Sequence, residues 1–282
     1  CPEHANSLNP DIVIKGQDIQ KLEKYLNLSF DYCQPPYWEA YEKLETGILK
    51  ITEGCPFNCT YCSVKKIAPN FKSYKLNKVI NEFKLLQKQG ATNIAFYDDA
   101  LLFKPKKILL PFLKETKKLA KNINFHTPNA LHIRYISEQT LQEMIDAGFK
   151  TFFLGIENTD STWQKNTGGK TCLKEIEKAV NIIKSKGISP KNITAYLLMG
   201  HPDYDISDLE KTMEFIKQLG IKIFLSEFSP VPGSKDSKAC EKWIDLSDPL
   251  THNKTAFTTW QLGFEETNRL KGLASSLNKR LA

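Results

Sequence analysis

The amino-acid sequence predicts an α/β fold: a partial (β/α)6 barrel with a short N-terminal remnant and a C-terminal helical cap. The first observation behind this prediction is a set of six short segments rich in β-branched and aromatic residues, each bounded by Gly, Pro, Asn or charged residues. Strands that are buried on both faces of a parallel sheet have this composition. The six segments are Gly47–Thr52, Asn93–Asp98, Ile123–Thr127, Thr151–Glu157, Asn192–Met199 and Lys222–Phe228.

The second observation is a helical period of apolar residues between these segments, clearest at residues 76–86, 173–183 and 206–219. A glycine follows each of several helical patterns and precedes the next strand, as helix-ending glycines do. We expect the helix at 206–219 to begin with a capping box made by Ser207 and Glu210. An open doubly wound sheet is the alternative fold. In both folds the chemistry lies in the loops after the carboxyl ends of the strands.

The predicted core spans residues 47–235, and the segments on either side of it lack its alternation of strands and helices. Residues 1–46 hold a short predicted strand at 11–15 and a helix at 18–26, and we predict that they are a linker or the tail of a preceding domain. The sequence begins with Cys1 rather than Met, so we expect that residues precede it. Residues 236–282 are a predicted C-terminal extension, in which one long helix at 255–281 packs across the core.

Composition limits the possible classes of protein. Hydrophobic residues make up 41% and charged residues 25% of the 282 residues, so a large buried core is expected and general disorder is not. Lys plus Arg number 39 and Asp plus Glu 32, and the net charge of +7 does not indicate nucleic-acid binding. No apolar run approaches ~20 residues and no signal peptide is visible, so neither a membrane span nor secretion is expected. Seven cysteines in a chain of this length are not a disulfide framework, and a cytoplasmic location is expected.

The strongest signal is the group Cys55, Cys59 and Cys62, which follows the first predicted strand with the spacing C-x3-C-x2-C. Thiolates are soft ligands for iron–sulfur clusters or zinc. A structural zinc site needs a fourth ligand, and the next histidine along the chain is the distant His126. Three ligands without a fourth indicate a cluster with one iron open to a substrate or cofactor. A zinc site or three unrelated buried cysteines are the alternatives.

The segment Gly54–Cys62, with the aromatic Tyr61 directly before the last cysteine, resembles the radical S-adenosylmethionine (SAM) superfamily. The resemblance covers about residues 47–235. It implies a TIM-like partial barrel and a 4Fe-4S cluster on the three cysteines, with SAM chelated by the open iron. It further implies reductive cleavage of SAM to a 5′-deoxyadenosyl radical, which abstracts hydrogen from a substrate, and a reductant such as flavodoxin or ferredoxin.

The same resemblance assigns cofactor-binding roles at four strand ends. Asp98 and Asp99 stand where the family often has a Gly-Gly-Glu element that holds the amino group of SAM. This chain departs from that element, and a helix-capping pair is the alternative. Glu157 lies in a segment similar to the family's Gly-Ile-Glu-Ser and would contact the ribose or amino-acid end of SAM, unless it is a surface residue. Gly200 would let the backbone approach the adenine, and Tyr61 completes the cofactor set.

No catalytic residue can be assigned from the sequence. His126 and His201 are weak candidates, because each follows or ends a predicted strand, and ordinary turn chemistry explains both equally well. Cys1, Cys33, Cys172 and Cys240 are widely separated, so isolated thiols are expected rather than a second cluster.

Residues 1–16 resemble the last strand of the cobalamin-binding domain that precedes many of these barrels. The Asp-x-His-x-x-Gly motif that supplies a cobalamin ligand does not occur in the 282 residues. Cobalamin is therefore expected only with a further domain. The favoured branch is a cobalamin-dependent methyltransferase or related enzyme. The alternatives are a tRNA methylthiotransferase-like enzyme and a non-catalytic zinc or iron–sulfur module. The substrate is unknown.

Overall fold

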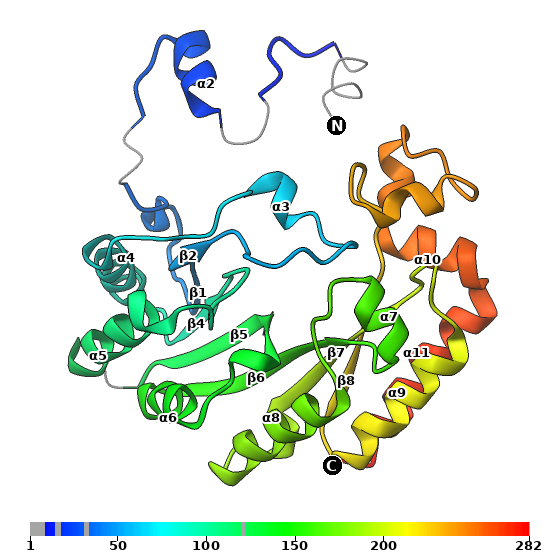
Figure 1. The fold of residues 1–282 in the computed structure, drawn as a ribbon. Coiled ribbons are helices and arrows are strands. Elements are labelled where there is room, and N and C mark those ends of the chain that lie inside the picture. Colours follow the sequence, from blue (N-terminus) through cyan, green and yellow to red (C-terminus); the bar gives the residue numbers. More distant parts are fainter. Residues whose placement is uncertain (1–8, 15–17, 31–33, 120–121, 282) are drawn as a thin grey trace.

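The computed structural model describes residues 9–14, 18–30, 34–119 and 122–281. Six parallel strands form one sheet in the order β1-β4-β5-β6-β7-β8, so chain order is also spatial order for these strands (Figure 1). β1 and β8 are the edge strands, and the sheet is a barrel left open between them. The predicted partial (β/α)6 barrel is confirmed. The strands are β1 (Thr46–Leu49), β4 (Asn93–Phe96), β5 (Asn124–Leu131), β6 (Phe149–Glu157), β7 (Ile193–Met199) and β8 (Lys222–Glu227).

Helices between the strands cover the outer face of this sheet (Figure 1). Their apolar stripes and alternate strand residues form one continuous core, in which contacting phenylalanine rings such as Phe83, Phe96, Phe112 and Phe125 are almost fully buried. Burial of this apolar surface is the main force that holds the layers together. The helices are α4 (Leu76–Lys88), α5 (Leu109–Leu119), α6 (Glu138–Ala147), α8 (Leu173–Ser185) and α9 (Ile206–Gln218), with the short α7 (Ser161–Asn166) before α8.

The carboxyl end predicted for the first strand, Gly47–Thr52, is wrong. β1 stops at Leu49, and a separate strand β2 (Thr52–Glu53) pairs antiparallel with β3 (Lys72–Ser73). The capping box predicted for α9 is also wrong. Asp205 caps this helix by accepting a hydrogen bond from the backbone N–H of Ser207, so the cap lies two residues earlier than the sequence pattern indicated.

Among the described residues of the N-terminal segment, 19–26 form the α-helix α2 (Ile19–Leu26), and this helix buries none of its residues. The strand predicted at 11–15 does not form over residues 11–14, while residue 15 lies outside the described residues. Cys1 and Cys33 also lie outside them. Further along, a short 3-10 helix (Trp38–Ala40) leads to β1, and Trp38 packs against the core.

The C-terminal extension holds two helices, α10 (Lys254–Leu262) and α11 (Phe264–Lys279), rather than the one long helix predicted. Gly263 separates them with a φ of +83°, a backbone angle that a helix does not accommodate. α11 packs on the core through Leu270, and its Asn278 side chain bonds both backbone polar groups of Ile223. This contact covers part of the open edge of β8. None of the helices in the described part of the chain combines the length and apolar character needed to cross a membrane.

Candidate functional site

The three cysteines lie on one loop, residues 54–63, between β2 and the short helix α3 (Val64–Ile67). We refer to this segment as the cysteine loop. The cysteines are free and half-buried, and the backbone N–H of Cys62 donates to the carbonyl of Cys59 (3.1 Å). Further bonds anchor the loop from outside: the N–H of Gly54 donates to Asp99 (3.0 Å), and the N–H of Thr60 donates to the carbonyl of Thr167 (3.2 Å). The loop is therefore fixed from several sides.

Burial makes ionisation of the thiols costly in the metal-free protein. It raises the pKa of Cys55 to about 11, against a hydrogen bond from the backbone of Phe57, and the neighbouring Cys59 and Cys62 raise it further. The pKa of Cys62 is also raised, again chiefly by burial. Bound metal would relieve this penalty, because it offsets the charge of several thiolates in one place.

The donor set of the loop fits an iron–sulfur cluster. Three thiolates on one loop are ligands typical of such clusters. In the described residues, no three His, Cys, Asp or Glu side chains gather closely enough to hold a single metal ion.

A charged pair lies beside the thiols. Glu157 ends β6 with a φ of +65°, unusual for a residue other than glycine, and accepts a bond of 2.7 Å from the Nζ of Lys170. Burial would lower the pKa of Lys170, but the charges of Glu157, Cys59 and Cys62 together raise it. Lys170 therefore stays positive next to two of the three cysteines, which suits a site that holds anionic groups.

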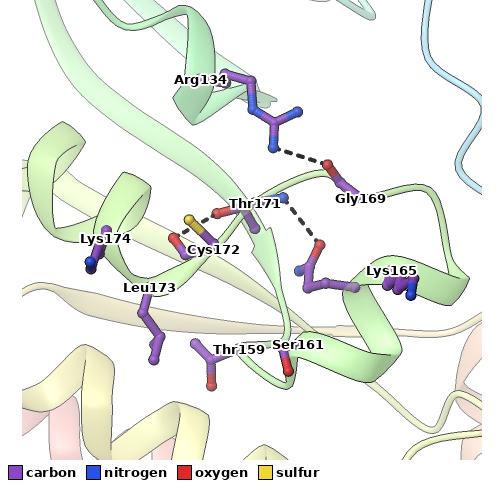
Figure 2. A pocket seen from close by; sticks show the side chains of 10 residues that line it. Arg134, Thr159, Ser161, Lys165, Gly169, Thr171, Cys172, Leu173 and Lys174 are labelled. Carbon is purple, nitrogen blue, oxygen red and sulfur yellow. Dashed lines mark hydrogen bonds between the residues drawn. The ribbon is translucent and has the colours of Figure 1, made fainter.

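Sequence reasoning missed Lys170. The available signal was the pair Gly168-Gly169 directly before it, where a Cβ on Gly168 would lie 3.2 Å from the Cα of Cys59. The loop that carries Lys170 also forms the wall of an outer cavity of about 510 Å³ (Figure 2). There Arg134 donates to the carbonyl of Gly169 (3.0 Å), and this bond fixes the loop at the residue before Lys170.

The two neighbouring aspartates differ in what they contact. Asp98 is almost fully buried and accepts from the backbone N–H groups of Ile51 and Thr52 and from the Thr52 hydroxyl. Burial raises its pKa to about 7, although these bonds oppose the shift. Asp99 is more exposed and pairs with Lys50 at 3.4 Å. Asp98 thus holds the chain just before the cysteine loop, while Asp99 borders the loop itself.

Tyr61 packs against residues of two other segments. Its ring stacks on Trp163 of α7 at a centroid distance of 5.7 Å and meets His201 edge-on at 6.4 Å. Burial raises the pKa of Tyr61 well above its ordinary value, and the charge of Glu157 adds to the shift. His201 is fully buried and bonds Asp236 of the C-terminal extension at 2.9 Å.

His132 is a second residue that the sequence reasoning missed. It follows β5 and lies against Phe57 of the cysteine loop, with ring centroids 4.3 Å apart. Burial lowers its pKa to about 4, and the positive charges of Lys170 and Arg134 act in the same direction. A neutral imidazole therefore stands beside the loop at neutral pH. The sequence offered no such signal, because the predicted strand ended at Thr127, whereas β5 runs on to Leu131.

A comparison with protein-family models identifies the family of this chain. The model of the radical SAM superfamily matches residues 49–216, more than half of the chain. This chain belongs to the radical SAM superfamily. The superfamily uses a 4Fe-4S cluster and SAM, in agreement with the cofactors that the cysteine spacing and the resemblance implied.

The relatives of this radical SAM protein are distant. An uncharacterized methyltransferase of Pyrococcus horikoshii is 23% identical over 222 residues, which are 77% of this chain and 46% of the relative. The ribosomal protein uS12 methylthiotransferase RimO of Clostridium botulinum is 25% identical over 258 residues, which are 83% of this chain and 57% of RimO. The chain spans about half the length of these curated relatives.

A solved structure shares the fold. The radical SAM methyltransferase TsrM from Kitasatospora setae, solved with tryptophan and a SAM analogue, superimposes with a TM-score of 0.62 at 15% identity. The match covers 72% of this chain and 40% of TsrM.

Two candidates of the radical SAM site lie elsewhere than expected. His126 bonds Asn93 and Thr151, which lie near the amino ends of their strands, so it is far along the barrel from the cysteine loop. Gly200 has a φ of +80°, and a Cβ there would lie 2.6 Å from the hydroxyl of Thr258 on α10. The close approach that Gly200 permits in this structure is therefore to the C-terminal extension.

The remaining described cysteines show no common site. Cys172 is exposed at the start of α8, whereas Cys240 is buried in a small second core of the C-terminal extension.

Proposed function

We propose that Cys55, Cys59 and Cys62 bind a 4Fe-4S cluster with one open iron for SAM, in an enzyme that generates a 5′-deoxyadenosyl radical. The observation that carries this proposal is the group of three free, half-buried thiols on one anchored loop with the positive Lys170 beside them. When bound, the cluster supplies the electron that cleaves SAM to methionine and the radical.

Residues around the cysteine loop would orient SAM. Lys170 offers a partly buried positive charge for the carboxylate of SAM, and Glu157 next to it can accept hydrogen bonds from ribose hydroxyls or the amino group. Asp99 stands at the opposite end of the loop and can accept from the amino group. The partly buried ring of Tyr61 excludes water from the segment between Cys59 and Cys62.

The wider reaction is proposed from the relatives. Methyl transfer with cobalamin held by a further domain is the favoured branch, supported by the likeness to TsrM, which has been solved with cobalamin and a 4Fe-4S cluster. Methylthio transfer is the second candidate, supported by the similarity to RimO. Flavodoxin or ferredoxin is the proposed reductant and the cytoplasm the proposed location. Nucleic acid is not a proposed partner.

The test begins with anaerobic reconstitution of the whole chain with iron and sulfide. We expect brown protein that contains about four irons per chain, and formation of 5′-deoxyadenosine when dithionite and SAM are added. Cys55→Ala and Cys59→Ala should abolish both results. Cys172→Ala is the matched control, because this cysteine is exposed and lies on another segment, and it should behave as the wild type. Wild-type protein that binds zinc but no iron would contradict the proposal.

A further inference from the structure

A buried chain of polar contacts joins the cysteine loop to the C-terminal extension. The carbonyl of Thr60 accepts from the backbone N–H groups of Lys235 (3.1 Å) and Asp236 (3.4 Å). The hydroxyl of Thr60 donates to the Oδ2 of Asp236 (2.6 Å), and the Nε2 of His201 bonds the same oxygen (2.9 Å). Asp236 thus receives one bond from the loop and one from the residue that follows β7 and Gly200.

The contacts of His201 fix its proton. Its Nδ1 accepts from the indole N–H of Trp163 (3.3 Å) and from the backbone N–H of Asp203 (3.2 Å), so this nitrogen carries no proton. The proton is therefore on Nε2, which donates to Asp236. The ring is fully buried, and both of its nitrogens are engaged. Gln261 of α10 adds a bond to the carbonyl of His201 (3.2 Å).

The two residues between Cys59 and Cys62 both touch this chain of contacts. Thr60 bonds Asp236, whereas Tyr61 stacks on Trp163 with an angle of 17° between the rings and meets His201 edge-on. The small second core surrounds these contacts with apolar side chains from α7, β7 and the extension. Its members are Trp163, Leu198, Phe228, Cys240, Ile244 and Phe257.

A buried, hydrogen-bonded Asp–His pair adds little net stability, because both groups lose their water. The pair instead fixes the relative orientation of the two residues, because only one geometry uses every donor and acceptor. A contact of this kind is suited to fixing a position rather than to increasing stability.

We propose that His201 is a positioning residue that acts through Asp236 on Thr60 to fix the Cys59–Cys62 segment for the cluster. The C-terminal extension is then a working part of the cysteine loop and not only a cover of the barrel. This inference rests on the proposed function, because it assumes that the loop holds a cluster. It assigns His201 a role other than the acid–base catalysis for which the sequence made it a weak candidate.

The first test compares Thr60→Val with Thr60→Ser. Valine keeps the shape of threonine but cannot donate to Asp236, whereas serine can. After reconstitution, we expect a chelator to remove iron from Thr60→Val about tenfold faster than from the wild type, as loss of a bond to a charged group predicts. Thr60→Ser should restore the rate to within about twofold. An unchanged rate in Thr60→Val would overturn the proposal.

The matched control is Thr116→Val. Thr116 is buried in α5, and its hydroxyl donates to the carbonyl of Leu113 in the same helix, away from the cysteine loop. This variant loses a buried hydroxyl bond, here to a neutral carbonyl, and should release iron at the wild-type rate. It should also leave the electron paramagnetic resonance spectrum of the reduced cluster unchanged, whereas Thr60→Val should shift that spectrum. Equal effects of the two variants would show a merely structural role and overturn the proposal.

A double variant tests the route through Asp236. His201→Phe keeps a buried ring against Tyr61 and Phe228 but removes the bond to Asp236. If both residues act through the one carboxylate, Thr60→Val combined with His201→Phe should release iron no faster than the worse single variant. If the rate increases of the two single variants multiply in the double variant, the proposed action through Asp236 is contradicted.

The last measurement separates this inference from the proposed function. Hydrogen exchange of the Thr60 and Cys62 amides can be followed in the metal-free protein, where these amides donate to Thr167 and Cys59. Thr60→Val and His201→Phe should both speed this exchange by about tenfold, and wild-type-like exchange in both would overturn the inference. If the wild type takes up no cluster, the proposed function fails, while the exchange result still decides whether His201 positions the segment.

Discussion

The carboxylates at the ends of β4 and β6 invite comparison, because the family resemblance implies a cofactor-binding role for both Asp98 and Glu157. Asp98 accepts bonds from the backbone of Ile51 and Thr52 and contacts the chain before the cysteine loop. Glu157 instead pairs with Lys170 beside the thiols. Two buried acids at the ends of β4 and β6, which β5 separates in the sheet, thus do different work. Asp98 holds the backbone, and Glu157 forms an ion pair with Lys170. Position at a strand end does not by itself identify a cofactor contact.

The largest effect that this comparison predicts is a loss of folding stability in Asp98→Ala. This change leaves two backbone N–H groups and one hydroxyl buried without their acceptor, and each such group costs about 1–3 kcal/mol. We expect a loss of about 5 kcal/mol in the free energy of unfolding, measured by urea denaturation. Asp146→Ala on the exposed side of α6 should change it by less than about 0.5 kcal/mol. A loss below about 1 kcal/mol for Asp98→Ala would mean that the backbone does not depend on this carboxyl.

A pH dependence should follow from the same residue. The pKa of Asp98 rises from its ordinary 3.8 to about 7 in the folded protein, mainly because the carboxyl is buried. Between these values the folded state holds a proton that the unfolded chain releases. The stability from this group is therefore present below about pH 4 and is lost as the pH rises to 7, by at most ~4 kcal/mol. Asp98→Asn does not titrate and should flatten this part of the stability–pH curve. An identical slope in wild type and variant would refute this assignment.

The smallest expected effect concerns the Glu157 side of the comparison. Lys170→Met removes the positive charge beside Cys59 and Cys62, and we expect SAM to bind about tenfold more weakly to the reconstituted protein, a change of ~1.4 kcal/mol. Lys174→Met, at the exposed rim of the outer cavity, is the control and should alter the affinity by less than about twofold. Equilibrium dialysis with labelled SAM measures both. Equal affinities for all three proteins would place the SAM carboxylate elsewhere.

The sequence was sufficient for features that depend on local pattern. The six strands follow from apolar runs of about four to eight residues and the helices from the helical period of apolar residues. The cysteine loop follows from eight consecutive positions. Lys170 escaped prediction because its partner Glu157 is thirteen residues away across a short helix. The bond between Thr60 and Asp236 spans 176 positions, and no local pattern marks it. The break at Gly263 was missed because the apolar spacing continues past it.

The small ribbon of β2 and β3 has a consequence for cofactor loading. In this ribbon Glu53 lies opposite Lys72. A hydrogen bond from the N–H of Tyr74 to the carbonyl of Ile51 (3.0 Å) extends the pairing by one step. Both ends of the segment that carries the cysteines are therefore fixed by the folded chain. The entropy of closing this segment is lost during folding and not when iron and sulfide arrive. Folding thus brings the two ends of the cysteine segment together before the cluster is assembled.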